Sequence, residues 1–205
     1  MIYITSICSD MLIDYDNYEL LINDLLNKIK QEDKLIVITS SLKNQSSLLL
    51  EQILKTNINT PNELINLILS NKEIESSGFL GLYLNKLKIN YKILTPYQIP
   101  ILVNDDEIEY VEINNILSSL SKTKVLIIPG NIGISRSLVS QYYGSEGPDY
   151  LAFYIYKELK KRKLKTSCYI YKSVVNNECN FSNKVNDLIN KNNLTYTIYD
   201  NFLKN

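Results

Sequence analysis

The stretch KVLIIPGNIG (residues 124–133) is an apolar, β-favouring run that ends in a glycine turn. Because its residues are apolar at successive positions, the strand expected at 124–128 is buried on both faces, as in a parallel sheet. Ligands of such sheets bind at the carboxyl ends of the strands, where this turn lies. Four of the six glycines of the chain fall in the turn and the residues after it: Gly130, Gly133, Gly144 and Gly147. They are candidate contacts to a phosphate-bearing cofactor, although glycines also occur in turns that only connect secondary-structure elements.

Apolar runs and helical patterns alternate on both sides of this segment. The expected strands cover residues 2–8, 35–40, 91–95, 107–112, 124–128, 167–175 and 194–199. The expected helices cover residues 15–31, 46–56, 60–70, 73–88, 113–121, 149–161 and 182–192, and irregular chain is expected at 96–106 and 129–149. Strands that alternate with helices predict a three-layer α/β/α sandwich with a mainly parallel sheet.

The helices expected at 60–70 and 73–88 carry two local signals. Thr60-Pro61-Asn62-Glu63 is typical of a helix start, with an N-cap hydroxyl, proline at the first helical position and glutamate two residues later. Gly78 and Gly81 lie inside the second helix, where each costs up to about 1 kcal/mol relative to alanine. We expect both to be kept for close packing against a neighbouring backbone.

Composition excludes several classes of protein. The 205 residues contain 22 Lys and Arg, 22 Asp and Glu, and no His, so the net charge is zero. The absence of a basic excess argues against nucleic-acid binding, and the absence of His removes His-dependent catalysis and His metal sites. No apolar run is long enough to span a membrane. We expect one domain, 1–205, in the cytoplasm, with no metal site and with Cys8 and Cys168 as buried free thiols.

The residues after the central strand resemble those of the aspartokinases. VLIIPGNIG followed by YYGSEGPDYLAFYIYKEL (142–159) is similar to the aspartokinase pattern of a strand, GFxG, a hairpin, LGRGGSD and a helix. Residues 35–41, 64–106 and 185–202 resemble, in the same order, three further aspartokinase segments. The resemblance implies the amino-acid kinase fold and transfer of the γ-phosphoryl group of Mg-ATP to the aspartate side-chain carboxylate.

The resemblance also assigns candidate site residues. It implies a catalytic role for Asp149, cofactor contacts from the four glycines of the window and from Lys172, and substrate contacts from a set of polar side chains. That substrate set is Ser40, Ser41, Glu73, Gln98 and Ser145. Acids in the first turn of a helix are also stabilised by the helix dipole whatever their function, which is the alternative interpretation of Glu73 and Asp149.

Three parts of the aspartokinase machinery are missing. Residues 3–9, which match KFGGTS, contain neither lysine nor glycine. The clamping arginine of LGRGGSD is replaced by Ser145, and the next glycine by Glu146. The segment between Val175 and Ser182 is too short to fold over a base. Lys172, Lys43 or Arg136 are the residues that could replace the lost cations.

These departures predict a non-catalytic binding or regulatory homologue with no bound cofactor, whose partner is a small carboxylate metabolite or a protein. Two alternatives stay open: an active aspartate or carboxylate kinase that uses Mg-ATP in a minimal nucleotide site, and a binding module for an acyl or phospho-metabolite. No regulatory domains are expected after residue 205. The tyrosine-rich runs 142–143 and 150–156 predict a homodimer, because Tyr is enriched at interfaces.

Overall fold

The computed structural model describes residues 1–56, 58, 60–144, 146–173 and 181–200. Its helices are α1 (Asn17–Lys28), α2 (Gln45–Lys55), α3 (Asn62–Lys86), α4 (Ile113–Lys122), α5 (Gly147–Lys161) and α6 (Asn183–Lys191), with a short 3-10 turn at Ser9–Met11. Its strands are β1 (Ile2–Ile7), β2 (Lys34–Thr39), β3 (Tyr91–Ile93), β4 (Ile101–Asn104), β5 (Glu107–Val111), β6 (Val125–Pro129), β7 (Ile132–Ile134), β8 (Ser140–Tyr142), β9 (Thr166–Tyr171) and β10 (Thr197–Tyr199).

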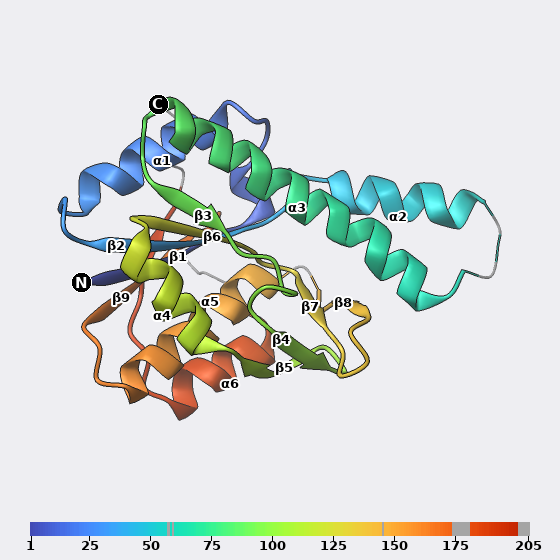
Figure 1. Ribbon diagram of the computed structural model, residues 1–205. Coiled ribbons are helices and arrows are strands. Elements are labelled where there is room, and N and C mark those ends of the chain that lie inside the picture. Colours follow the sequence, from blue (N-terminus) through green and yellow to red (C-terminus); the bar gives the residue numbers. More distant parts are fainter. Residues whose placement is uncertain (57, 59, 145, 174–180, 201–205) are drawn as a thin grey trace.

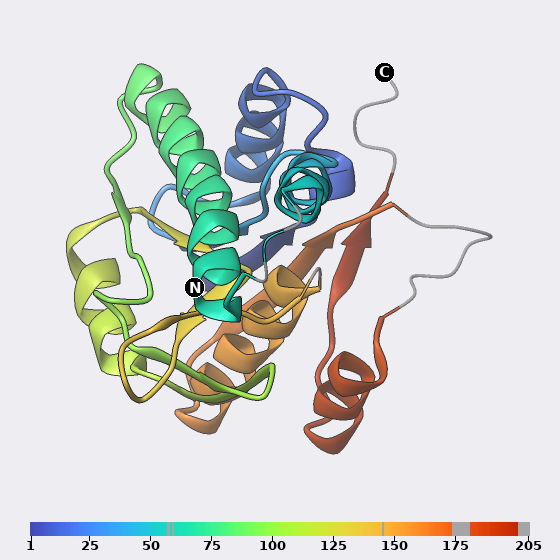
Figure 2. The same cartoon turned by 90° about the vertical axis from the view of Figure 1, so that its right-hand side faces the viewer.

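A six-stranded sheet with the order β10-β9-β1-β2-β6-β3 forms the centre, and all its pairings are parallel. Helices α1 and α3 pack on one face, while α4, α5 and α6 pack on the other (Figure 1; Figure 2). Alternate residues of β2 enter the two cores: Leu35 and Val37 point toward α1 and α3, and Ile36 and Ile38 toward α5. The predicted three-layer α/β/α sandwich with a mainly parallel sheet is confirmed.

The segments expected to be irregular contain three of the four strands of a second, smaller sheet. Its strand order is β5-β4-β7-β8, so β4 lies inside the expected loop 96–106, and β7 and β8 lie inside 129–149. The prediction of irregular chain was wrong there because β4 has four residues, and β7 and β8 three each. Such lengths are too short for a periodic pattern to emerge.

Helix α3 is one continuous helix of 25 residues, where two helices separated near residues 71–72 had been expected. Neither Gly nor Pro stands at Asn71-Lys72, and Lys72 pairs with Glu75 at 2.6 Å, one turn further along the helix. The first half of α3 and α2 project beyond the sheet as an antiparallel pair (Figure 1). This continuity moves Glu73 from an expected first turn to mid-helix, which removes the helix-dipole explanation for that residue.

The prediction that both α3 glycines pack against a backbone was also wrong. A Cβ atom at Gly81 lies 2.9 Å from the ring of Tyr91, which is a side-chain contact, and a Cβ atom at Gly78 meets no atom within 4 Å. In the part of the chain that the structure describes, no helix has the length and apolar character needed to cross a membrane.

Candidate functional site

The parallel strands β1, β2, β6 and β9 all end at the same edge of the sheet, and polar side chains follow each of them. Cys8 follows β1, Ser40 and Ser41 follow β2, Asn131 lies just after β6, and Lys172 follows β9. Helix α5 begins at the same edge, and Asp149 lies in its first turn. Sequence positions far apart therefore meet where the sequence analysis placed the ligand site.

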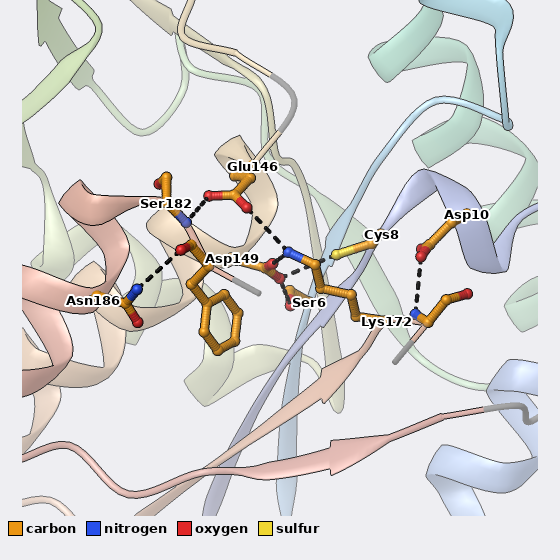
Figure 3. A network of polar contacts seen from close by, with 10 residues as sticks. Ser6, Cys8, Asp10, Glu146, Asp149, Lys172, Ser182 and Asn186 are labelled. Carbon is orange, nitrogen blue, oxygen red and sulfur yellow. Dashed lines mark hydrogen bonds and ion pairs between the residues drawn. The ribbon is translucent and has the colours of Figure 1, made fainter. Parts of the chain in front are cut away.

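Asp149 is the centre of the first of two polar groups, which we call the Asp149 cluster: Ser6, Cys8, Glu146, Asp149 and Lys172 (Figure 3). Its carboxylate is fully buried. The Ser6 hydroxyl donates to Oδ1 at 2.5 Å, and the Cys8 thiol donates to the same oxygen at 3.2 Å. Lys172 Nζ lies 3.1 Å from Oδ2. Both carboxylate oxygens are thus occupied by donors of the protein itself.

Lys172 also contacts a second acid. Its Nζ lies 3.3 Å from Glu146 Oε1, while Glu146 Oε2 accepts the backbone N–H of Ser182 at 2.6 Å. Burial lowers the pKa of the ammonium, but attraction to Asp149, Cys8 and Glu146 outweighs it and raises the pKa well above the usual value. One ammonium therefore faces two carboxylates, which leaves the Asp149 cluster with a formal charge of −1.

Glu73 is the centre of the second group. It is completely buried on α3, and Asn131 Nδ2 donates to its Oε1 at 2.8 Å. Its Oε2 has no hydrogen-bond partner of good geometry among the described residues, although the N–H and hydroxyl groups of Ser41 are near enough to favour the carboxylate. Burial outweighs these donors and raises the pKa of Glu73 to about 7.

A small pocket is lined by Asn131 and Ser41, the two residues that interact with the buried Glu73, and we call it the Glu73 pocket. Its volume is about 100 Å³. Its lining is Ser9, Ser41, Leu42, Asn44, Ser46, Ser47, Asn131 and Tyr142. This volume holds several water molecules or the head of a small metabolite, since about 10–15 Å³ suffices for one water. Because Ser9 follows Cys8 directly, the Glu73 pocket and the Asp149 cluster are neighbours.

Three of the four window glycines pack against the protein itself. A Cβ atom at Gly130 would lie 2.7 Å from Pro148, and one at Gly147 would lie 2.4 Å from the Asn131 side chain. Gly133 approaches Val103 of β4 in the same way. Close packing accounts for these three positions without a ligand. Gly144 has open space around it and a φ of 96°, a conformation that favours glycine.

The remaining predicted site residues divide clearly. Ser40 joins the Glu73 group, because its hydroxyl accepts from Asn131 Nδ2 at 3.4 Å. Gln98 instead closes a turn by accepting the Thr95 N–H at 2.9 Å, and it lines a separate cavity of about 360 Å³ beside α4. Ser145 lies outside the described residues, as does Cys179.

The cations considered as replacements are placed differently from one another. Arg136 has 82% of its side chain exposed. Its guanidinium lies 3.1 Å from the carboxylate of Glu109, on β5 of the smaller sheet. Lys43 is exposed beside the Glu73 pocket. Lys172 alone of these three reaches the Asp149 cluster. Cys8 and Cys168 are buried free thiols, as predicted.

Sequence reasoning missed two members of the site. Asn131 was quoted only as part of the glycine turn, yet it joins Glu73 to the pocket wall. No role was predicted for Ser6, whose hydroxyl donates to Asp149. The sequence feature that could have identified Asn131 as a site residue is its polar amide just after the fully apolar strand β6.

Solved structures share this fold. Aspartate kinase from Synechocystis has a TM-score of 0.70 and 20% identity, and the match covers 85% of this chain and 29% of that one. E. coli aspartokinase III, solved with aspartate and ADP, has a TM-score of 0.67 and 15% identity over 85% of this chain and 49% of that one. The chain thus spans less than half the length of these two relatives. UMP kinase from Ureaplasma parvum has a TM-score of 0.60 and 14% identity over 98% and 90% of the two chains.

Comparison with curated protein sequences returns no match. The model of the amino acid kinase family, in contrast, matches residues 6–173, which include the end of β1, all of β9 and every element between them. The parallel sheet, the polar groups at its carboxyl edge and this match agree with one another, and the chain belongs to the amino acid kinase family.

Proposed function

We propose that this chain is a non-catalytic member of the family that binds a small carboxylate metabolite or a protein partner and does not transfer phosphoryl groups. The observation that carries the proposal is the pairing of Lys172 with both Asp149 and Glu146. A phosphoryl-transfer site needs cations and N–H donors directed at the phosphates. Here the one cation of the Asp149 cluster is already neutralised, and a carboxylate stands beside it.

The departures from aspartokinases in the sequence support the same proposal. Residues 3–9 supply Ser6 and Cys8 to Asp149 rather than a lysine to a phosphate. Losing one preorganised charge-stabilising contact typically lowers a rate by about 10²–10³. Loss of several such contacts leaves little turnover, even though the effects are not additive.

The Glu73 pocket supports binding of a small ligand. Its wall carries serine hydroxyls, which can donate to a carboxylate, and its volume suits a small molecule rather than a nucleotide. Buried free thiols at Cys8 and Cys168 are compatible with a reducing compartment, and we place the protein in the cytoplasm as part of the proposal.

The second candidate is an active aspartate or carboxylate kinase with a minimal nucleotide site. One observation favours it: Lys172 Nζ lies at the carboxyl end of β9, beside the retained Asp149. In this alternative, the phosphates of Mg-ATP displace Glu146 from Lys172 and take over the ammonium as their cation.

Calorimetry and an ADP-release assay separate the two candidates. The purified chain is titrated with Mg-ATP, and turnover is measured with aspartate, UMP and isopentenyl phosphate as separate acceptors. We expect no binding heat from Mg-ATP and no ADP release above that of the Asp149→Ala variant. Turnover that disappears in Asp149→Ala would establish the active kinase instead.

A second variant tests the physical reason. Glu146→Gln removes one of the two carboxylates on Lys172 while it keeps a side chain of the same size. If neutralisation of Lys172 is what prevents phosphate binding, this variant gains measurable affinity for pyrophosphate relative to the wild type. An unchanged absence of pyrophosphate binding would show that neutralisation by Glu146 is not the cause.

A further inference from the structure

The cavity beside α4 belongs to neither of the two polar groups described above, and we call it the α4 cavity. It holds about 360 Å³, against about 100 Å³ for the Glu73 pocket. Its described lining is Lys92, Leu94, Gln98, Ile99, Asn115, Ser118 and Ser119. The structure thus places Gln98, an expected substrate contact, in this cavity and not in the Glu73 pocket.

Three elements build the α4 cavity: the edge strand β3, the turn that follows it, and α4. Lys92 lies in the middle of β3, with its side chain on the face that carries α4. The turn is closed by the Thr95 N–H, which donates to Gln98 Oε1 at 2.9 Å. Asn115 of α4 donates from Nδ2 to the backbone oxygen of Gln98 at 3.3 Å. The walls of the cavity are therefore held in place by contacts within the chain.

Lys92 carries the charge of the α4 cavity. Its Nζ donates to the Ser119 hydroxyl oxygen at 3.3 Å, and Ser119 is only 8% exposed, so that oxygen is a fixed acceptor. In the part of the chain that the structure describes, no ion pair includes Lys92, whereas Lys172 faces two carboxylates. A lysine on an edge strand also discourages pairing with another strand, so the indication of a ligand depends on the groups around it.

Those groups are neutral and have hydrogen-bonding capacity to spare. The Gln98 amino group, the Ser118 hydroxyl and the Asn115 side-chain oxygen make no hydrogen bond to any other residue that the structure describes. None of the described lining residues is acidic. Donors and an acceptor beside one cation suit a ligand that carries both a carboxylate and hydroxyl groups, because a hydroxyl donates as well as accepts.

A phosphate suits the α4 cavity less well than a carboxylate. Phosphates bind at helix N-termini, where free N–H groups face the anion. The N-terminus of α4 is already capped, because Glu112 Oε1 accepts the Asn114 N–H at 3.1 Å. That carboxylate repels a dianion, and the single ammonium of Lys92 balances only one negative charge. The geometry favours a monoanion.

The volume and the floor of the α4 cavity favour a polar ligand of several carbons. About 360 Å³ lies within the range of about 300–1,000 Å³ that is typical of small-molecule sites. Leu94 is 2% exposed and Ile99 is fully buried. They lie beneath the polar side chains and offer almost no surface to an apolar tail.

We propose that the α4 cavity binds a hydroxylated monocarboxylate, such as a sugar acid. Its carboxylate pairs with Lys92 Nζ, and its hydroxyl groups bond to Gln98, Asn115 and Ser118. The described linings of the α4 cavity and the Glu73 pocket share no residue. This second site therefore stands or falls independently of the function proposed above.

Titration of the full chain with gluconate tests the proposal, with acetate and glucose as probes of the separate groups. Acetate carries the charge without the hydroxyls, and glucose carries hydroxyls without the charge. Binding is followed at constant ionic strength by the NMR signals of the Gln98 and Asn115 side-chain amides. We expect saturable shifts with gluconate, with a Kd of about 1 mM or below, and binding at least about tenfold weaker for acetate and for glucose.

Three outcomes of this titration would overturn the proposal. Gluconate that gives no saturable shift would exclude the site. Acetate that binds as tightly as gluconate would show that the hydroxyl groups are not recognised. Inorganic phosphate that binds more tightly than gluconate would show that the class of ligand is wrong.

Lys92→Met removes the ammonium and keeps a side chain of similar length. Because Lys92 is exposed on an edge strand, we expect this variant to fold with a Tm close to that of the wild type and to bind gluconate at least about tenfold more weakly. Lys122→Met is the matched control, since Lys122 is exposed at the end of α4 and does not line the cavity. It should bind gluconate like the wild type. Equal losses in the two variants would show a general effect of charge and contradict the assigned contact, as would unchanged binding in Lys92→Met.

Ser118→Ala tests the contact to the ligand hydroxyls. This variant keeps Lys92 and removes one hydroxyl from the wall of the α4 cavity. It should weaken the binding of gluconate severalfold and leave that of acetate unchanged, because acetate has no hydroxyl group to lose a partner. An equal effect on both probes, or no effect on gluconate, would contradict the orientation proposed for the ligand.

Discussion

Lys172 Nζ lies 3.1 Å from Asp149 Oδ2, and it is the ammonium that compensates a carboxylate with no exposed surface. Lys172→Met leaves that carboxylate buried and unpaired, which typically costs about 3–5 kcal/mol. We expect a corresponding loss in the free energy of unfolding, measured by urea denaturation. The double variant Lys172→Met/Asp149→Asn removes the unpaired charge and should recover at least half of the loss. Equal instability of the single and double variants would show that the pair does not act as a unit.

Glu73 predicts a pH dependence of stability. Its pKa is about 7 in the folded protein against an ordinary value of 4.5, so the folded state binds more protons than the unfolded state between these values. Stability from this group is complete below about pH 4.5 and is lost as the pH rises through 7. The shift corresponds to roughly 3 kcal/mol at about 1.4 kcal/mol per pH unit.

The Glu73→Gln variant isolates this contribution. The difference in unfolding free energy between the variant and the wild type should grow in favour of the variant from pH 5 to pH 8. Denaturation at several pH values, with both proteins in the same buffers, measures that difference. A difference that stays constant with pH would mean that Glu73 titrates normally.

The two glycines of α3 should respond in different ways to alanine. Gly78→Ala adds a methyl group in open space and should stabilise the chain by about 0.5–1 kcal/mol. Gly81→Ala gains the same helix propensity but forces the Tyr91 ring and Ile93 to move, so it should give no net gain. Thermal melts of the two variants beside the wild type, at one protein concentration, compare them. A higher Tm for Gly81→Ala than for Gly78→Ala would contradict the packing described for α3.

Cys8 and Cys168 should resist thiol reagents in the native protein. Burial, together with the neighbouring Asp149 carboxylate, raises the pKa of both thiols, and the thiolate is the reactive form. We expect both to be alkylated at least about 100-fold more slowly at pH 8 than in unfolded protein. Peptide mass spectrometry after timed labelling assigns each rate. Rapid native labelling of Cys8 would show that the Asp149 cluster opens to solvent.

The centre of the main sheet was predictable because β2 and β6 are apolar at successive positions and buried on both faces. Residues 35–40 and 124–128 matched β2 and β6 closely for this reason, and the alternation with helices fixed the three layers. The strands β4, β7 and β8 were not predicted because they have three or four residues each and lie among the prolines and glycines of 96–106 and 129–149. The break expected near Asn71-Lys72 failed because polar residues on an exposed helix turn look like a loop when only the sequence is available.

The sequence predicted where the polar side chains of the candidate site gather, but not their contacts. The glycine window and the strand ends indicated the carboxyl edge of the sheet, where the structure places the Asp149 cluster. Gly130 packs on Pro148, and Gly147 packs on Asn131. These are tertiary contacts, and no pattern in the neighbouring sequence predicts them. The same holds for Ser6 and Cys8, which donate to an aspartate more than 140 positions away in the chain.

The continuity of α3 limits how this chain can change its length. Glu73 faces the buried site and Ile74 faces outward, so two neighbouring residues serve opposite sides of the same turn. Inserting one residue after Glu73 would rotate everything beyond it by about 100°. Leu80 and Leu84, which are fully buried, would then leave the core. Substitutions can therefore accumulate along α3, whereas insertions and deletions belong in the turns on either side of it.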